Sequence, residues 1–263
     1  RRKVLIMVLV LNFGILIFLK YFNLFAGGMN SFLEKSGMTG PIPILHLALP
    51  LGISFYTFQS IGYLIDVYRE KFEPERNPAK YALFVSFFPQ LIQGPISFYD
   101  QLAHQLYAER NFSYKNLKHG TLLMLWGYFK KMVIADRAVS LIQMVAPDYM
   151  QYNGTVIFIT VLVYALQLYA DFSGGIDISR GFAEILGIEM AENFCRPYFA
   201  VSINDYWRRW HITLGAWMKN YVFYSLAMSK RFFKMGKNLK QKYGDHAVGA
   251  HIAKVLPAGI ASF

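Results

Sequence analysis

Two long apolar runs stand out along this chain of 263 residues. Residues 4–19 are apolar except for Asn12 and Gly14, and residues 155–170 contain no charged side chain. A helix needs about 20 mainly apolar residues to cross the hydrocarbon core of a bilayer. We therefore predict that both runs are transmembrane helices. A signal peptide is the alternative for the first run, but no small-residue cleavage site follows it.

Two further apolar stretches are interrupted by proline and polar residues. Residues 44–67 contain Pro50, which predicts a span that is kinked near this proline. Residues 81–99 contain the sequence FFPQLIQGP, in which Pro89 and Pro95 flank two glutamines. Broken backbone at membrane depth is tolerated only where it is buried in protein or lines a cavity. We therefore interpret residues 81–99 as a pair of re-entrant half-helices.

The remaining segments predict loops and shorter helices. Residues 23–43 are rich in glycine and proline and predict a loop, whereas residues 100–119 have the pattern of a helix on the membrane surface. Residues 120–129 are apolar but too short to span alone. Residues 228–242 hold six Lys or Arg and no acidic residue, which predicts a cytoplasmic loop. Residues 247–263 predict the beginning of another apolar helix.

The composition agrees with a membrane protein. The net charge is +11, yet 55% of the residues are hydrophobic and the mean hydropathy is +0.28. Charged residues make up 16%, against about 25% in soluble domains, so the charge does not indicate a nucleic-acid-binding surface. Cys195 is the only cysteine, which excludes a disulfide scaffold. We predict an all-α, multi-pass protein of the cell membrane, surrounded by lipids and without a nucleic-acid partner.

We expect residues 1–263 to form a single membrane-embedded domain that is truncated at both ends. The chain opens on a basic triplet rather than on Met, directly before an apolar run, and it stops at Phe263 within another apolar run. The length has room for about six to eight membrane segments.

The sequence lacks the motifs of common soluble enzymes. It contains no glycine-rich phosphate loop, no G-x-S-x-G motif, no H-E-x-x-H motif and no cysteine cluster. Five of its histidines are scattered without the spacing of metal ligands: His46, His104, His119, His246 and His251. We therefore predict no metal site.

One polar group follows directly on the second apolar run. Asp171, Ser173, Asp177 and Arg180 lie within three turns if the helix continues. A carboxylate in hydrocarbon costs about 2.5–3.5 kcal/mol, so both aspartates should face water, a cavity or a partner such as Arg180. The residues alone leave two interpretations open: a functional polar site, or a helix end at the membrane surface.

A second polar group lies farther along the chain. Ser202 and Asp205 have the S-x-x-D spacing of a helix start, which predicts a helix over residues 204–214. On such a helix Asn204, Trp207 and His211 would share one face.

This spacing makes His211 a candidate general base. A histidine beside tryptophans is partly desolvated and is therefore neutral at pH 7, as a general base must be. Arg208, three residues before His211, would reach it on the predicted helix. The structural alternatives are that Trp207 and Trp210 anchor the chain at the membrane interface and that the arginines extend toward anionic headgroups.

Four motifs in this chain resemble the membrane-bound O-acyltransferase family. They span about residues 50–226 and read PLGISFYTFQSIGYLIDVYR, FFPQLIQGPI, YALQLYADFSGGIDI and ENFCRPYFAVSINDYWRRWHITLGAWMKNYVFYSL. The W-R-R-W-H block is the most specific of them. The chain is most similar to the bacterial branch that contains the alginate O-acetyltransferase membrane subunit and the D-alanyl transfer protein of teichoic acid. The resemblance implies tilted helices and re-entrant segments around a central funnel.

The resemblance also implies a role for His211, which matches the first of two characteristic family histidines. The second, which the resemblance gives as the principal catalytic histidine, stands in a Trp-His-Gly setting within an apolar helix and is absent from this sequence. The apolar run near Val255 corresponds to the approach to that helix, so we expect the encoded protein to continue into it. By this resemblance the 263-residue segment alone is inactive.

The resemblance implies an enzyme that moves an acyl group, with acetyl as the expected group, from a thioester donor to a hydroxyl. The donor would be acetyl-CoA or an acyl carrier protein, with no bound cofactor, and the acceptor an extracytoplasmic polymer or a partner protein, such as a partner acyltransferase. His211 would be catalytic. Only His211 is carried by the motif match. From their positions we also expect Asn204, Trp207, Arg208 and Asp171 to bind substrate, the first three by lining the funnel and Asp171 by holding the adjoining segment.

Two other functions are compatible with the pattern. Broken helices and intramembrane carboxylates are also typical of transporters, although the chain lacks the inverted repeat of many of them. A noncatalytic scaffold that docks a partner enzyme is the other alternative. Turnover of an acyl donor would distinguish an acyltransferase from both.

Overall fold

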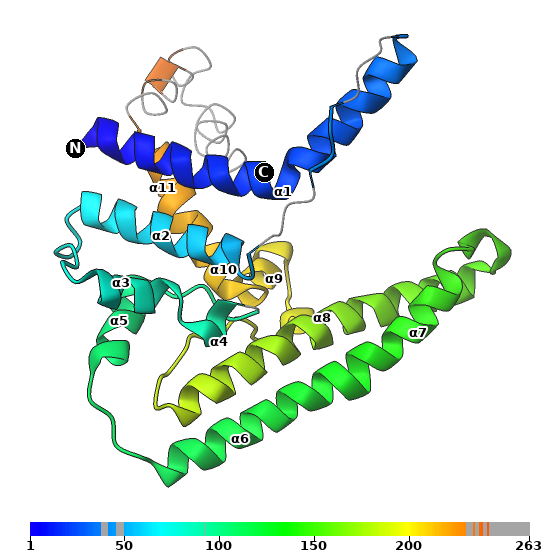
Figure 1. The fold of residues 1–263 in the computed structure, drawn as a ribbon. Helices are drawn as coiled ribbons and strands as arrows, with labels where there is room; N and C mark the ends of the chain where they lie inside the picture. Colours follow the sequence, from blue (N-terminus) through cyan, green and yellow to red (C-terminus); the bar gives the residue numbers. More distant parts are fainter. Residues whose placement is uncertain are drawn as a thin grey trace. The chain divides into compact units, whose positions relative to one another are not determined.

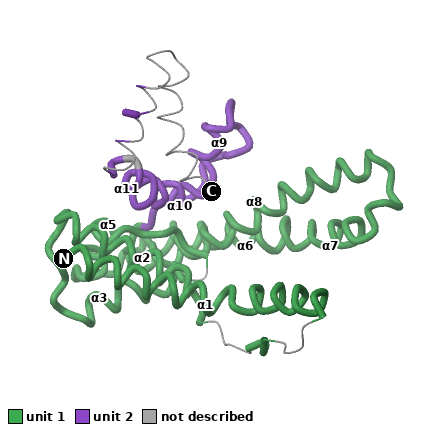
Figure 2. The backbone as a smooth tube through the Cα atoms, turned by 90° about the horizontal axis from the view of Figure 1, so that it is seen from above, with its two compact units in different colours: residues 1–189 green, residues 190–263 purple. Residues whose placement is uncertain are grey.

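The computed structural model describes residues 1–37, 42–45, 50–91 and 93–229, together with positions 234, 237, 238 and 241. The predicted helix over 247–263 and most of the predicted loop over 228–242 lie outside the described residues. The chain divides into two compact units, residues 1–189 and 190–263 (Figure 2). The described residues form helices, and their only β pairing is one isolated bridge, which confirms the all-α class. The single domain remains a prediction.

Two helices of unit 1 are long and apolar enough to cross a membrane. They are α1 (Arg2–Lys35) and α8 (Gly154–Ile185), of 34 and 32 residues. Both predicted spans are therefore found as helices, and both extend beyond their apolar runs. The loop predicted to begin at residue 23 was wrong over the second half of α1. Gly27 and Gly28 do not end this helix, since its backbone hydrogen bonds continue through them to Lys35.

The chain folds back on itself to pair α8 with a second long helical run. This run comprises α6 (Tyr114–Tyr128), the π-helical segment η1 (Phe129–Ala135) and α7 (Asp136–Val145). A short 3₁₀ turn, η2 (Tyr149–Gln151), precedes the return. Figure 1 shows residues 114–145 lying along α8, and we call these two elements the helical pair. The apolar stretch 120–129 lies inside this run, which continues through the lysines that follow it.

Glycines allow the helical pair to pack closely. A Cβ placed on Gly127 would lie 2.6 Å from the carbonyl oxygen of Gly174. A Cβ placed on Gly181 would lie 2.5 Å from the carbonyl oxygen of Gly120. The two glycines on each helix are seven residues apart, which places them on the same face two turns from each other. The backbones therefore approach each other at two levels, as small residues permit in membrane helix pairs.

The interrupted stretches form short helices. Within the described part of the stretch predicted as one kinked span, the helix is α2 (Ile53–Tyr68), which begins after Gly52 in the left-handed region at φ 75°. The FFPQLIQGP region contains α4 (Phe88–Leu91), preceded by α3 (Pro78–Val85). The broken backbone is thus confirmed, whereas its position at membrane depth remains a prediction. The surface helix predicted over 100–119 is split between α5 (Tyr99–Tyr107) and the beginning of α6.

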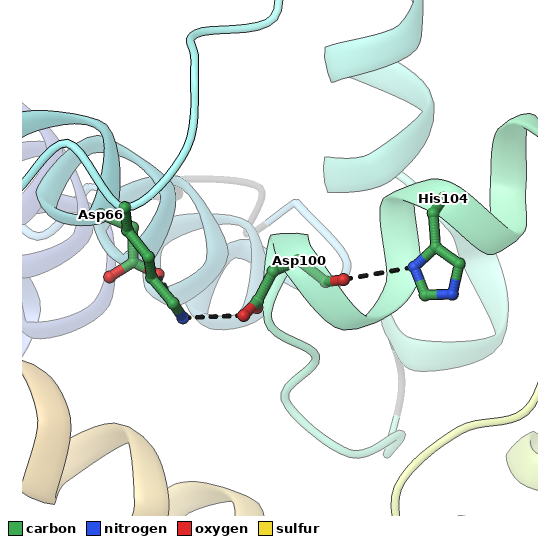
Figure 3. Close-up of polar contacts among 4 residues, drawn as sticks. Asp66, Asp100 and His104 are labelled. Carbon is green, nitrogen blue, oxygen red and sulfur yellow. Dashed lines mark hydrogen bonds and ion pairs between the residues drawn. The ribbon is translucent and has the colours of Figure 1, made fainter.

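A lysine bridges α2 and α5. Lys71 Nζ lies 2.8 Å from a carboxylate oxygen of Asp100 and 3.5 Å from one of Asp66, which is buried. Figure 3 shows the Asp100 contact and, one turn along, His104 Nδ1 at 3.2 Å from the Asp100 carbonyl oxygen. Five aromatic rings pack against one another in the same part of the unit: Tyr63, Phe72, Tyr81, Phe84 and Tyr99. This cluster is the core of the short-helix region.

Unit 2 is built from short helices separated by irregular backbone. Its described elements are η3 (Pro197–Phe199), α9 (Ile203–Arg209), α10 (Ile212–Trp217), the π-helical η4 (Met218–Phe223) and α11 (Tyr224–Ala227). The predicted helix start is confirmed, because Ser202 Oγ accepts from the Asp205 N–H at 3.1 Å.

The continuous helix predicted over 204–214 was wrong. Trp210 leaves the helix in an extended conformation and forms an antiparallel bridge with Phe194. The Cys195 N–H donates to the Arg209 carbonyl and the Ile212 N–H donates to the Asn193 carbonyl, each at 2.9 Å. These hydrogen bonds to residues 193–195 replace the helical ones. We call residues 193–213 the histidine segment.

Candidate functional site

His211 occupies the break between α9 and α10. Its backbone lies in the left-handed region, with φ 47° and ψ 52°. A residue other than glycine pays about 1–3 kcal/mol for such a conformation, and residues of this kind cluster at active sites. The observed strain therefore supports a functional role for this histidine.

A buried asparagine contacts the His211 ring. Asn193 is 1% exposed, and its Oδ1 lies 3.2 Å from His211 Nδ1. The same oxygen accepts hydrogen bonds from the Thr213 N–H and from Thr213 Oγ1, each at 2.9 Å. Neither residue was singled out in the sequence. The sequence does show that Asn193 and Thr213 are polar residues at the two ends of an aromatic-rich stretch. A local pattern cannot show that these two residues contact each other in the folded chain.

Burial controls the charge of His211. Removal from solvent lowers the pKa of its imidazole to about 4, while a backbone hydrogen bond acts in the opposite direction. The ring is therefore neutral at pH 7, in agreement with the expectation from the neighbouring tryptophans. A neutral imidazole has one ring nitrogen with a free lone pair, which can accept a proton.

The residues predicted to share a face with His211 lie on α9, which ends before it. Asn204 and Arg208 are exposed, and Trp207 is 61% exposed. The Trp207 ring packs edge-on against Tyr206 at 5.4 Å between centroids. The prediction of a common helical face was wrong, because the chain turns at residues 210–211. The predicted substrate-binding role of these three residues remains a prediction.

Asp171 belongs to unit 1, where it takes part in the helical pair. Its carboxylate lies 2.5 Å from Lys131 Nζ, and the Asp177 carboxylate lies 2.6 Å from Lys130 Nζ. The expected pairing of Asp177 with Arg180 is present at 3.8 Å, but Lys130 is the closer partner.

Lys130 also donates to Ser173 Oγ at 3.0 Å. Neither lysine was predicted as a partner, because both precede the aspartates by about 40 residues. A search for opposite charges on two neighbouring predicted helices could have found them.

One cavity of unit 1 lies apart from the predicted site residues. A cavity of about 400 Å³ in unit 1 is lined by residues of α1, α2 and the 75–81 region and contains none of the predicted site residues. Within the described ranges, no group of three or more His, Cys, Asp or Glu side chains is arranged to hold a metal ion.

Comparison with known proteins gives one family and several relatives. Residues 74–239 match the model of the membrane-bound O-acyltransferase family. The probable alginate O-acetylase AlgI of Pseudomonas aeruginosa is 36% identical over 222 residues, covering 84% of this chain and 42% of that relative.

Two further relatives act on other polymers by name. The peptidoglycan O-acetyltransferase of Helicobacter pylori is 36% identical over 252 residues, covering 86% of this chain and 47% of the relative. The teichoic acid D-alanyltransferase of Bacillus subtilis is 29% identical over 178 residues, covering 66% and 44%. The chain thus spans less than half the length of these relatives.

Proposed function

Because this chain belongs to the membrane-bound O-acyltransferase family, we propose that it is part of a multi-pass membrane enzyme that transfers an acyl group from a thioester donor to a hydroxyl group. The observation that carries this proposal is the neutral, partly buried and strained His211 within the W-R-R-W-H block. The candidate spans α1 and α8 support a membrane location.

The names of the relatives support a choice of acyl group and acceptor. The two relatives at 36% identity are named for O-acetyl transfer, whereas the D-alanyl transfer protein is 29% identical. We therefore propose acetyl as the group and an extracytoplasmic polymer, or a partner acyltransferase that passes the group on, as the acceptor. The proposed donor is acetyl-CoA or an acyl carrier protein.

His211, together with the second family histidine that this sequence lacks, would help deprotonate or position the acceptor hydroxyl, and in this proposal it is the general base. A ring nitrogen accepts the proton of the acceptor hydroxyl while the hydroxyl oxygen attacks the thioester carbonyl carbon. The carbon–sulfur bond then breaks, and the thiolate takes the proton from the imidazolium to leave as a thiol. The acyl group ends on the acceptor oxygen, and His211 returns to its neutral form.

The magnitude of this contribution follows from the pKa of the base. General-base catalysis contributes about 10²–10⁴-fold to a rate, and it is most efficient when the pKa lies near the working pH. With a pKa of about 4, His211 is fully unprotonated at pH 7 but is a weaker base than an ordinary imidazole. We therefore expect a contribution at the lower end, about 10²-fold.

The other predicted site residues have supporting roles in this proposal. Asn204, Trp207 and Arg208 are exposed on α9, where they are available to bind substrate. Asp171 supports the membrane part of the enzyme through its ion pair with Lys131. No observation favours the transporter or the scaffold, and turnover of an acyl thioester distinguishes the proposed enzyme from both.

The test is the substitution His211→Asn in the full-length protein. Asparagine tolerates the left-handed backbone but cannot act as a base at neutral pH, so the fold is retained while the chemistry is lost. We expect polymer acetylation per mole of enzyme to fall about 10²-fold or more, with an unchanged melting temperature in detergent.

The matched control is His104→Asn, which changes an exposed histidine of α5 and should leave both quantities unchanged. Near-normal acetylation by His211→Asn, or a loss that melting fully explains, would reject the proposed role.

A further inference from the structure

We propose that Asn193 is a positioning residue that holds His211 in a single tautomer, with the proton on Nδ1 and the lone pair on Nε2. This inference rests on the proposed role of His211 as the base. The inference adds which ring nitrogen accepts the proton, and which side chain fixes the tautomer that presents this nitrogen.

The orientation of the Asn193 amide is fixed by its surroundings. The Thr213 backbone N–H is a donor under all conditions, and it lies 2.9 Å from the amide atom assigned as Oδ1. If the amide were turned over, its NH₂ group would face this N–H, and two donors would meet in a buried site. The oxygen must therefore point toward Thr213 and His211.

The tautomer follows from this orientation. Asn193 Oδ1 has no proton to give, so His211 Nδ1 at 3.2 Å must be the donor in their hydrogen bond. A neutral imidazole carries one proton, and this leaves the lone pair on Nε2. Without the Asn193 oxygen, the tautomer with the proton on Nδ1 loses a hydrogen-bond acceptor, and the fraction of the population that presents Nε2 as the base falls.

Backbone hydrogen bonds hold the two residues together. The Asn193 carbonyl accepts the Ile212 N–H at 2.9 Å, so the main chain on one side of His211 is tied directly to the asparagine. The Phe194–Trp210 bridge ties the chain on the other side. The histidine therefore has little freedom to move away from Oδ1, and its left-handed backbone is kept in place.

Packing alone does not explain an asparagine at this position. Its Nδ2 is buried and has no hydrogen-bond partner among the described residues. An unsatisfied buried donor costs about 1–3 kcal/mol, and an apolar residue here would leave the buried Thr213 N–H without its acceptor at a similar cost. The contribution of the amide is therefore its oxygen, which serves Thr213 and the His211 ring.

The charged residues closest to this pair along the chain are Glu192 and Arg196 beside Asn193 and Arg208 and Arg209 beside His211, and α9 packs against α10. Asp205 is paired with Arg209 at 3.0 Å, and Arg208 is exposed. These groups are the same in every variant used below, so a difference between variants reports on residue 193.

Two substitutions in the full-length protein test the proposal. Asn193→Leu removes the acceptor, and we expect kcat/KM for polymer acetylation to fall at least 10-fold. Asn193→Asp keeps an acceptor oxygen at the same place, so activity at pH 8 should recover to within about threefold of wild type. Its negative charge favours the imidazolium, which raises the pKa of His211 and moves the acid limb of the pH profile upward by about one unit or more.

The tautomer can be observed directly. Nitrogen-15 NMR of histidine-labelled, detergent-solubilised protein, assigned with His211→Asn, should show Nδ1 protonated in the wild type and a mixture of tautomers in Asn193→Leu. An unchanged tautomer in Asn193→Leu, or an unshifted acid limb in Asn193→Asp, would overturn the positioning role. Full activity of His211→Asn would instead overturn the proposed function, so the two failures are distinguishable.

Discussion

The helical pair and the histidine segment both bury polar side chains, but they stabilise them in different ways. In the helical pair, Lys130 and Asp177 neutralise each other across two long helices whose backbone hydrogen bonds remain within each helix. In the histidine segment, the helix ends at Arg209. Backbone N–H and carbonyl groups of residues 193–195 form the hydrogen bonds that the chain after the helix no longer makes within it.

The two regions therefore differ in what their buried polar groups cost in free energy. The helical pair has regular backbone, and its cost is the desolvation of two charges, which mutual attraction and a hydroxyl contact offset. The histidine segment avoids a buried charge by keeping His211 neutral and accepts backbone strain instead. Removing an ion-pair partner should therefore unfold the helical pair. Removing a contact of His211 should instead lower activity without unfolding the histidine segment.

The largest effect on stability is expected from Lys130→Met. The Lys130 and Asp177 side chains are only 9% and 15% exposed, so this change removes the closer cation of a largely buried carboxylate and leaves only Arg180 at 3.8 Å. Breaking one partner of a buried pair costs about 3–5 kcal/mol. We expect that loss in the free energy of unfolding, measured by denaturant titration of the detergent-solubilised protein.

A control variant and a double variant complete this measurement. Lys115→Met changes an exposed lysine of α6 and should cost less than about 0.5 kcal/mol. Adding Asp177→Leu to Lys130→Met removes both charges and should restore most of the stability. If Lys130→Met is as stable as Lys115→Met, the ion pair does not hold the helical pair together. If His211→Asn unfolds as Lys130→Met does, the contrast between the regions fails.

Local sequence patterns predicted the regular elements of this fold. The apolar runs of α1 and α8 gave two long helices, and the Ser202–Asp205 spacing gave the start of α9. These elements are predictable because the helix start of α9 is set by a hydrogen bond within that helix, and α1 and α8 are recognised from their apolar content alone. Their ends were less accurate, because a helix continues past its apolar run when polar side chains find partners.

The errors share a long-range cause. The lysines at 130–131 seemed to end a short segment, but their carboxylate partners lie about 40 residues later. The helix predicted through His211 was interrupted by the bridge to Phe194, which no spacing within 204–214 reveals. The family motif indicated His211, whereas its contact with Asn193 became visible only when the chain was folded.

A smaller effect is expected from Gly127→Ala in the helical pair. The added methyl group would meet the Gly174 carbonyl oxygen at 2.6 Å, a contact with backbone that cannot rotate away. Overpacking of this kind costs about 1–3 kcal/mol. The matched control is Gly14→Ala in α1, where no atom lies within 4 Å of the new Cβ.

The control should be neutral or gain about 0.5–1 kcal/mol from helix propensity. Both variants should be measured by the same denaturant titration. Equal behaviour of the two would show that the helices do not approach each other as closely as the structure indicates.

The smallest effect is expected from Asp171→Asn. This change removes the Lys131–Asp171 ion pair and leaves the Lys130–Asp177 ion pair in place. Lys131 and Asp171 are 41% and 30% exposed, and Lys131 also lies 3.4 Å from Asp136. An ion pair with this exposure contributes about 0.2–1 kcal/mol, because water and the second carboxylate compensate for its loss. Acetylation should stay within about twofold of wild type, since we assign Asp171 a supporting role. Loss of acetylation with unchanged unfolding would instead place Asp171 in contact with substrate, and the helical pair would then contribute chemistry as well as structure.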